Sequence, residues 1–492
     1  MILCKLLIFI IIRSVILENN SNRMFPHVFL RRILFIYQQE MYMTDKMLSY
    51  AFSQRVFSSP EILNSLDWTK KVKVFFWGTL LVSALSFVSF EISVFHQSSW
   101  GLFIIMTLFF VLLHYLLLPL YLIMVKVLFD PIDIYLKKQI VQKAKKKLQG
   151  FSDLIIIGVA GSYGKTTVKD LLCHVLSKKY KVIKTELSKN TPLGIAEAID
   201  KITTDHQIFI VEMGEMYQGD VLEIAEFVNP KYGIITGINE QHLERFQTFD
   251  NIIATINELS AFVPDSGCMW GNGDCESTTQ SLPQFSSAPI SFFSNTSIDS
   301  QQYLQTGKQK IVYKGHVIQS LFIADYYPSL VDVSFQIGKF FEMKELDIIE
   351  ALESFEAVDR RMNPQYFKDI NTLVIDDTYN GNMDGVKHAI QTLLRFPQRK
   401  VYVTAGLKEL GAKEESSHVQ LGKWLAESVD EVWLVEKSVT PFIMKGLISK
   451  GFNTKNIKIF ETQLEIDVFC EEKRFEKNHV YLFQNRWSDN YF

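Results

Sequence analysis

"GVAGSYGKTTVKDLL", Gly158–Leu172, is the most informative segment of this sequence for its fold. It follows the apolar run of residues 154–157, which reads as a buried strand, and it opens a helical pattern. Glycines let the backbone come close to phosphate oxygens, and the free N–H groups at the start of a helix attract negative charge. The sequence therefore predicts a strand, then a phosphate-binding loop over residues 161–167, then a helix.

Two side chains of this loop suit a nucleoside triphosphate. Lys165 can reach the β- and γ-phosphates, and the hydroxyl of Thr166 suits Mg²⁺. The usual spacing, G-x-x-x-x-G-K-[ST], needs a glycine at position 159, where this chain has Val159, and the glycines stand instead at 158, 161 and 164. The G-K-T core keeps its expected context, so we interpret the stretch as a variant phosphate loop, with a chance match in a loop as the alternative.

From residue 151 onward, strand-like apolar runs alternate with helical patterns. Six runs read as buried parallel strands, at residues 154–160, 206–214, 232–238, 372–380, 399–406 and 430–436. This alternation is typical of an α/β, doubly wound fold. Residues 268–330 predict short strands and loops, and a break near 357–364 divides the region. We expect a central P-loop ATP-binding domain at 151–356 and a C-terminal Rossmann-like α/β domain at 357–492.

Composition excludes several classes of protein. The chain has 492 residues, of which 48% are hydrophobic, and a formal net charge of -3. That charge does not indicate a nucleic-acid binder. Its five cysteines are scattered without a C-x-x-C pair, which is typical of reduced cytosolic thiols and favours neither a disulfide framework nor a zinc site.

Two long apolar segments precede the phosphate loop, at residues 74–95 and 100–129. Each exceeds the ~20 residues that cross a bilayer, and the short linker between them predicts a transmembrane helical hairpin at 71–130. Lysines flank both outer ends, including the run at 143–147, so both ends are expected in the cytoplasm. We therefore predict the inner (cytoplasmic) membrane with cytoplasmic catalytic domains. Two buried core helices are the alternative.

The regions around this hairpin are less informative. Residues 131–150 read as a basic linker, and residues 1–70 remain uncertain. The first ~20 residues are apolar around Lys5 and Arg13, as in a short membrane or signal-like segment. The alternative is an upstream start codon, with Met41 or Met43 as the true start.

The variant loop, G-x-x-G-S-x-G-K-T-T, resembles that of the Mur ligase family, the ATP-dependent ligases that extend the peptidoglycan stem peptide. Five further stretches agree in order and spacing: "SKNTPLGIAEAI" (188–199), "IVEMGEMYQGDVLEIAEFVNPKYGIITGINEQHLERFQTFDNI" (210–252), "DRRMNPQ" (359–365), "IDDTYNGNMDGV" (375–386) and "AGLKELG" (405–411). The fourth resembles D-D-S-Y-N-A-N-P, characteristic of the MurF branch, the UDP-N-acetylmuramoyl-tripeptide–D-alanyl-D-alanine ligases. The resemblance covers roughly residues 150–490.

The resemblance implies an amide-bond ligase that uses ATP and Mg²⁺ and releases ADP and phosphate. A substrate carboxylate attacks the γ-phosphate and becomes an acyl phosphate, and an amine then displaces phosphate. The implied partners are a small-molecule or lipid-linked cell-wall precursor and an amino acid or dipeptide, with D-alanyl-D-alanine expected. The C-terminal domain must close over the nucleotide.

The resemblance also implies roles for residues at the matching positions. The expected catalytic residues are Lys165, His242 and Arg361. The expected ATP contacts are Gly161, Ser162, Tyr163, Gly164, Lys165, Thr166, Thr167, Arg361 and Asp377. The expected substrate contacts are Asn190, Thr191, Asp376, Tyr379, Asn380 and Asn382. The expected metal ligands are Thr166, Glu212 and His242. The two aspartates also follow an apolar strand, and ligand sites of open α/β sheets lie at the carboxyl ends of strands.

The sequence departs from the family pattern in four places. Residues 326–332, "YYPSLVD", lack the asparagine that the family associates with adenine. Ile256 stands where the family has a carbamylated lysine that helps to hold a second magnesium, and isoleucine cannot ligate a metal. We expect Ile256→Lys to leave activity unchanged or to raise it. The family's K-G-S is replaced by "QNRWS" at 484–488, and residues 1–150 carry the hairpin and linker in place of a UDP-sugar-binding domain.

Three functions therefore stay open. The first is a MurF-type ligase of a cell-wall precursor. The second is a membrane-bound ligase of a poly-γ-glutamate-like capsule polymer. The third is a degenerate, nucleotide-binding partner protein, which Ile256 and the changed C-terminal motif favour.

Overall fold

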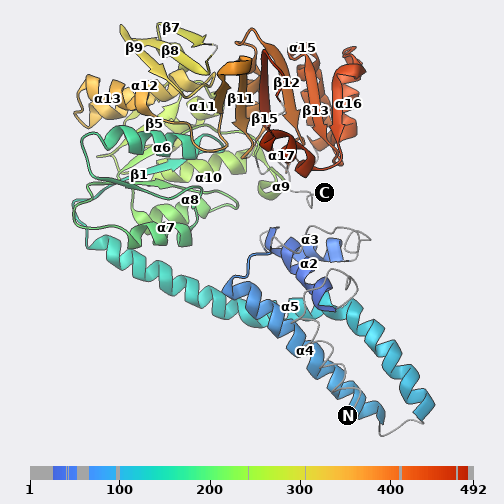
Figure 1. The fold of residues 1–492 in the computed structure, drawn as a ribbon. Coiled ribbons are helices and arrows are strands. Elements are labelled where there is room, and N and C mark those ends of the chain that lie inside the picture. The colour runs from blue at the N-terminus through green and yellow to red at the C-terminus, as the bar shows by residue number, and fades with distance from the viewer. Residues whose placement is uncertain are drawn as a thin grey trace. The chain divides into compact units, whose positions relative to one another are not determined.

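The computed structural model describes residues 26–39, 42, 44–51, 66–95, 100–241, 243–304, 306–379, 381–408, 410, 413–472 and 475–485. The chain divides into two units, residues 1–138 and 139–492. Figure 1 labels the elements of both units.

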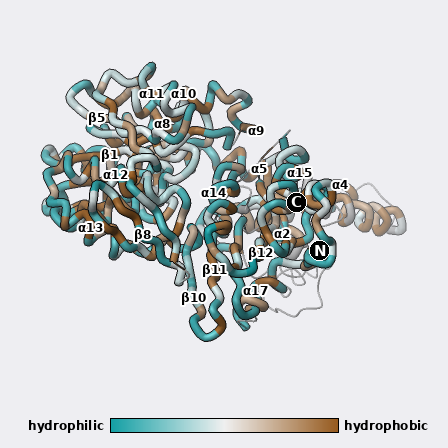
Figure 2. Tube along the Cα trace, turned by 90° about the horizontal axis from the view of Figure 1, so that it is seen from above, coloured by the Kyte–Doolittle hydropathy of each residue, from teal (hydrophilic) through white to brown (hydrophobic). Residues whose placement is uncertain are grey.

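The first unit is helical. It contains α2 (Pro26–Gln39), α3 (Thr44–Ala51), α4 (Lys70–Phe95) and most of α5 (Trp100–Gln149). Over residues 70–94, α4 is long and apolar enough to cross a membrane, with a mean hydropathy of 1.7, and Figure 2 colours much of it as hydrophobic. Helix α5 meets the same criterion only when its parts at 101–111 and 116–149, bent by 62° relative to each other, count as one span. Both expected spans are thus helical.

Polar side chains join α4 to α5 at three levels. Thr107 donates a hydrogen bond to Glu91 at 2.9 Å. His114 contacts the carbonyl of Ser83 at 2.6 Å through Nε2. The hydroxyl of Tyr121 lies 3.1 Å from Oγ of Ser86 on α4 and 3.1 Å from Nδ1 of His114 on its own helix. Between apolar helices such pairs fix how the two helices face each other, so His114 is a packing residue of the hairpin.

The end of α5 belongs to the second unit. Ala144 and Leu148 are buried in the same apolar cluster as residues of the central sheet and its helices. Lys145 donates to the carbonyl of Glu226 at 2.7 Å, and Lys147 donates to the carbonyl of Asp200 at 2.5 Å. The segment expected as a basic linker is therefore helical, and its last turns pack on the central domain.

The central domain is built on a six-stranded parallel sheet with the order β2-β3-β1-β4-β5-β6. The strands are β1 (Ile155–Ala160), β2 (Val182–Lys184), β3 (Ile208–Glu212), β4 (Tyr232–Ile235), β5 (Cys268–Asn272) and β6 (Ile290–Phe293). The helices between them are α6 (Lys165–Leu176), α7 (Pro192–Asp200), α8 (Asp220–Val228), α9 (Leu243–Phe246), α10 (Phe249–Phe262) and α11 (Glu276–Phe285).

Strand β1 shows why its sequence is a continuous apolar run. Ile157 and Val159 are buried in one apolar cluster, with α6, whereas Ile156 and Ala160 are buried in another, with α7, α8 and α10. A parallel strand covered by helices on both faces must be apolar at every position. The doubly wound α/β prediction is therefore confirmed.

A small antiparallel sheet follows the central one, with the order β7-β8-β9. It consists of β7 (Ser300–Leu304), β8 (Lys308–Tyr313) and β9 (His316–Ser320), and a short helix, η3 (Asn295–Ser297), precedes it. Two helices, α12 (Tyr327–Phe340) and α13 (Glu345–Ser354), complete this part and pack against α6.

The C-terminal domain has a second six-stranded sheet, with the order β10-β11-β15-β12-β13-β14, in which only the β10–β11 pair is antiparallel. Its strands are β10 (Asn363–Phe367), β11 (Thr372–Asp377), β12 (Arg399–Thr404), β13 (Glu431–Val435), β14 (Ile457–Phe460) and β15 (His479–Gln484). Its helices are η4 (Lys368–Ile370), α14 (Met383–Leu393), α15 (Glu414–Ser428), α16 (Thr440–Ser449), η6 (Thr454–Asn456) and α17 (Gln463–Glu471).

Candidate active site

The phosphate loop lies between β1 and α6, as predicted, and its glycines are required by geometry. Gly161 has φ +140°, and a Cβ there would lie 2.3 Å from Oγ1 of Thr236. Gly164, with φ 76°, precedes the first turn of α6. Both conformations are left-handed, which favours glycine over residues with a side chain. The backbone amides at the start of α6 are thus brought to the sheet edge where phosphate is expected.

The loop is held by the end of β4. The amide of Ser162 donates to the carbonyl of Gly237 at 2.8 Å, and the amide of Asn239 donates to Oγ of Ser162 at 3.1 Å. Thr236 donates through its hydroxyl to the carbonyl of Tyr163. Because β1 and β4 are neighbours in the sheet, the strand order itself shapes the cradle.

The loop lysine has an acidic partner. Nζ of Lys165 lies 2.8 Å from Oε1 of Glu215, whose side chain is almost fully buried, and it also contacts the carbonyl of Gly161. A nucleotide phosphate that binds Lys165 must therefore compete with the carboxylate of Glu215.

Arg361 bridges the two domains at this loop. Its Nη2 donates to Oγ1 of Thr166 at 3.1 Å. Its guanidinium lies over the ring of Tyr379, 4.2 Å from the ring centre, which is the geometry of a cation–π contact. Thr166 is 4% exposed. The structure thus brings Thr166 into contact with Arg361, which lies 195 positions later in the sequence.

Further contacts connect the same two domains beside Arg361. Asn239 donates to Asp384 at 2.9 Å, and Asn382 donates to Gln241 at 3.3 Å. Glu240 accepts an ion-pair contact from Lys413 at 2.5 Å. The segment 239–241 therefore closes against the start of α14 and the segment before α15.

Among the predicted site residues that the structure describes, Asp377 has a pKa shifted to near neutrality. Burial raises the pKa of its carboxyl from 3.8 to about 7, although Gln484, the amide of Met362 and the charge of Arg361 all act in the opposite direction. Gln484 donates to Oδ2 at 2.8 Å, and the amide of Met362 donates to Oδ1 at 3.2 Å. Residue 484, which departs from the family motif, is thus a direct partner of this carboxylate.

Three other residues that were predicted to contact substrate form hydrogen bonds with residues two or three positions later in the chain. Asp376 accepts from the amide and the hydroxyl of Thr378 at 3.0 and 2.6 Å. Thr191 caps α7 by accepting from the amide of Gly194 at 3.4 Å. Asn382 caps α14 through its Oδ1, which accepts from the amide of Gly385 at 2.8 Å. Such roles fix the loops that border the site.

Glu212, a predicted metal ligand, lies at the end of β3 and is 1% exposed. Its Oε2 lies 3.0 Å from Nζ of Lys169, which is fully buried. Its Oε1 accepts from Nδ2 of Asn190 at 3.2 Å. The structure therefore joins Glu212 to Asn190 of the predicted substrate loop, and it adds Lys169, which no sequence motif indicated.

The predicted metal site is only partly described. His242 and Asn380 lie outside the described residues. Within the described part, no three side chains of His, Cys, Asp or Glu come together to hold a metal ion. Thr166 and Glu212 carry the oxygen ligands that Mg²⁺ prefers. Ile256, at the position of the carbamylated lysine, is fully buried in the apolar cluster under α10.

Several other residues of the site were not predicted from the sequence. They lie within the quoted stretches, at positions to which the sequence assigned no role, or just after β4: Lys169, Glu215, Thr236, Asn239 and Asp384. The position of Lys169 carried a usable signal. A lysine four residues after Lys165 lies on the same face of α6, so it points toward the same strand ends.

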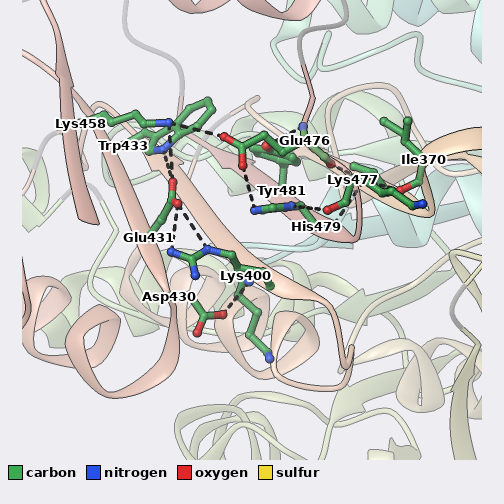
Figure 3. Close-up of polar contacts among 12 residues, drawn as sticks. Ile370, Lys400, Asp430, Glu431, Trp433, Lys458, Glu476, Lys477, His479 and Tyr481 are labelled. Atoms are coloured by element: carbon green, nitrogen blue, oxygen red, sulfur yellow. Dashed lines mark hydrogen bonds and ion pairs between the residues drawn. The ribbon is translucent and has the colours of Figure 1, made fainter. Parts of the chain in front are cut away.

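A second charged cluster of the C-terminal domain lies elsewhere (Figure 3). Arg399 donates to Glu431 at 3.1 Å, Lys458 lies 4.4 Å from the ring centre of Trp433, and His479 contacts the carbonyl of Lys477 at 2.8 Å. Arg399, Glu431 and His479 stand at the amino ends of β12, β13 and β15. Asp377 and Gln484 stand at the carboxyl ends of β11 and β15, so this cluster lies at the opposite edge of the sheet.

Comparison with known families gives two matches. The model of the Mur ligase middle domain matches residues 159–337. The model of the Mur ligase glutamate ligase domain matches residues 360–466. Together they cover more than half of the chain.

Individual relatives agree with these matches. The UDP-N-acetylmuramoyl-tripeptide–D-alanyl-D-alanine ligase of Escherichia coli is 25% identical over 327 residues, which are 63% of this chain and 71% of that protein. The ligase of the same name from Bacillus subtilis is 26% identical over 354 residues, 70% of this chain and 75% of that protein.

Solved structures show the same fold. MurF ligase from Thermotoga maritima, solved in complex with ADP, superposes with a TM-score of 0.62 at 24% identity and covers 71% of this chain and 80% of that one. MurF from Acinetobacter baumannii gives a TM-score of 0.62 at 22% identity, over 71% of this chain and 77% of that one.

Proposed function

Because this chain belongs to the Mur ligase family, we propose that it is an ATP-dependent ligase that joins D-alanyl-D-alanine to the peptide carboxylate of a cell-wall precursor. The named relatives support this substrate pair, since they are UDP-N-acetylmuramoyl-tripeptide–D-alanyl-D-alanine ligases. The observation that carries the proposal is the hydrogen bond from Arg361 to Thr166, which connects a second domain to the phosphate loop.

The proposed reaction has two steps. The acceptor carboxylate attacks the γ-phosphorus of ATP, the bond to the β,γ-bridging oxygen breaks, and an acyl phosphate and ADP result. The amine of the dipeptide then attacks the acyl carbon, loses a proton, and phosphate leaves. Catalysis of this kind depends on positioning and on charge placed around the phosphates.

The residues of this chain would divide these tasks. The amides of residues 161–167 and the charge of Lys165 hold the phosphates, and Arg361 faces the γ-phosphate from the other domain. Asp377 and Tyr379 border the nucleotide and amine. Mg²⁺, which neutralises phosphate charge when bound, would be held by Thr166 and Glu212, with His242 as the third ligand that the family resemblance implies.

Release of phosphate from ATP tests the proposal. We expect turnover only when D-alanyl-D-alanine and UDP-N-acetylmuramoyl-tripeptide are both present, and its loss in Lys165→Ala with unchanged melting. Lys178→Ala is the matched control, because Lys178 forms a surface ion pair with Glu350 just beyond the end of the same helix. Phosphate release with glutamate instead would favour a capsule-type ligase. Binding of ADP without any turnover would favour a partner protein.

We propose further that α4 and α5 attach the enzyme to the cytoplasmic membrane. The apolar length of α4 and the lysines at 70, 71 and 73 before it support an orientation with both ends in the cytoplasm. Sedimentation of the full chain with membranes, and its release by detergent but not by 1 M salt, would be the expected result. The phosphate-release assay, repeated with a lipid-linked muramoyl-tripeptide, distinguishes a lipid-linked acceptor from a UDP-linked one.

A further inference from the structure

Helix α6 carries two lysines on one face, and they have different surroundings. Lys165 is partly exposed and contacts Glu215. Lys169, one turn later, is fully buried. A buried ammonium is stable only when it is paired and hydrogen-bonded. The partners of Lys169 therefore show what this side chain holds together.

Those partners come from two places outside α6. Nζ of Lys169 lies 3.0 Å from Oε2 of Glu212 at the end of β3. It also donates to the carbonyl of Leu187, in the loop after β2. Its contact with its neighbour Asp170 is longer, at 3.7 Å. One charge thus connects the phosphate helix, the end of β3 and the loop 185–191.

The two ends of this loop form hydrogen bonds in which Lys169 is neither donor nor acceptor. The amide of Glu212 donates to Oγ1 of Thr185 at 3.1 Å. Asn190 donates to Oε1 of Glu212 at 3.2 Å, and its carbonyl accepts from the amide of Gly214 at 2.9 Å. Both ends of the loop therefore attach to the end of β3.

The middle of the loop is different. Leu187 has φ 47°, a left-handed conformation that costs a residue with a side chain. Its side chain is 77% exposed, so packing does not compensate that cost. The buried ammonium of Lys169 donates to the carbonyl of Leu187, and this contact connects the middle of the loop to α6 in addition to the turn bonds within the loop.

We propose that Lys169 is a positioning residue of the ligase reaction: it fixes the loop 185–191 on the acceptor side of the site and orients Glu212 toward the phosphate loop. It acts through Glu212, Asn190 and the loop backbone and touches no substrate itself. This inference rests on the proposed function, because Asn190 is expected to contact the acceptor.

The first test measures the loop directly and needs no ligase activity. In Lys169→Met, which keeps the length of the side chain, we expect amide hydrogen exchange in residues 187–191 to rise about tenfold or more, with β3 and the start of α6 unchanged. In the wild type the amides of Lys189 and Asn190 donate to the carbonyls of Glu186 and Ser188, and these hydrogen bonds slow their exchange. Lys184→Met is the matched control, because Lys184 pairs with Asp170 and not with Glu212.

The second test measures the consequence for catalysis. We expect Lys169→Met to raise KM for UDP-N-acetylmuramoyl-tripeptide about tenfold, and to change KM for ATP less than about threefold. Should the single variant not fold, Lys169→Met with Glu212→Gln removes both charges, and the exchange measurement is made on that protein. Unchanged loop exchange, or an equal rise in both KM values, would overturn the proposal. Faster loop exchange in a protein without ligase activity would leave the positioning role standing and remove the proposed function instead.

Discussion

The guanidinium of Arg361 donates a hydrogen bond of 3.1 Å to the hydroxyl of Thr166, although 195 positions separate the two residues. Thr166 lies at the start of α6, and Arg361 lies at the entry to the C-terminal domain. Asn239 donates a hydrogen bond of 2.9 Å to Asp384, which connects the same two domains. In this arrangement the two domains meet at the phosphate loop, so a charge from the second domain lies where the γ-phosphate is expected.

Arg361→Ala should therefore lower kcat with little effect on folding. Loss of one charged group that stabilises a transition state typically costs about 10²–10³-fold in kcat. Phosphate release under saturating substrates measures this effect, and thermal melting checks the fold. Arg360→Ala is the matched control, because Arg360 is half exposed and lies 4.0 Å from its neighbour Asp359. Equal losses in both variants would contradict the role given to Arg361.

The position of Ala144 and Leu148 predicts how the chain can be shortened. Both side chains are buried against the central domain, and burial of a leucine contributes about 1.5–3 kcal/mol. A fragment of residues 139–492 should therefore fold and bind ADP, and it should melt several degrees above a fragment of residues 151–492. Calorimetry of the two fragments measures the difference. Equal melting temperatures would show that the end of α5 adds nothing to the central core.

Ile256 leads to a correction of an expectation from the sequence. Its side chain is fully buried among apolar residues, where a lysine would place an unpaired ammonium in the core. Ile256→Lys should therefore destabilise the protein by several kcal/mol, on the order of 3–5 kcal/mol, and lower activity through unfolding. Urea unfolding measures the loss, and Ile256→Met, which conserves apolar volume, is the control. A stable and fully active Ile256→Lys variant would show that the lysine reaches the cleft.

The sequence was most informative where local chemistry and strand pattern coincide. The apolar run before Gly158 and the glycines after it predicted β1, the loop and α6. Both signals depend only on residues that are neighbours in the sequence. Strand β15 was not predicted, although "HVYLF" is apolar, because no helical pattern follows it. Yet it lies between β11 and β12 in the middle of the C-terminal sheet, and it supplies Gln484.

The contacts of the site were less predictable than its motifs. Which acid faces Lys165, and which loop carbonyl faces Lys169, depend on the strand order β3-β1-β4, and a single sequence does not show that order. The same holds for Thr191 and Asn382. Their side chains cap helices, a role that the sequence allows equally with substrate contact.

Asp377 predicts a dependence of stability on pH. Its carboxyl has a pKa of about 7 in the folded protein, raised by burial from 3.8. Between these two pH values the folded protein keeps a proton that the unfolded chain has released. The free energy of unfolding should therefore fall as the pH rises from about 4 to about 7 and level off above, by at most about 4 kcal/mol. Chemical unfolding at successive pH values, compared with Asp377→Asn, isolates this contribution, which the variant should lack.

Gln484→Lys should move this dependence to lower pH. Gln484 donates to Asp377 at 2.8 Å, and an ammonium in its place would favour the ionised carboxylate and lower its pKa. The loss of stability with rising pH should then shrink or disappear between pH 5 and 7. Gln365→Lys, an equal change on an exposed position of β10, should leave the profile as it is in the wild type. If the Gln484→Lys profile also stays unchanged, the shifted pKa of Asp377 does not depend on the group that residue 484 presents to it.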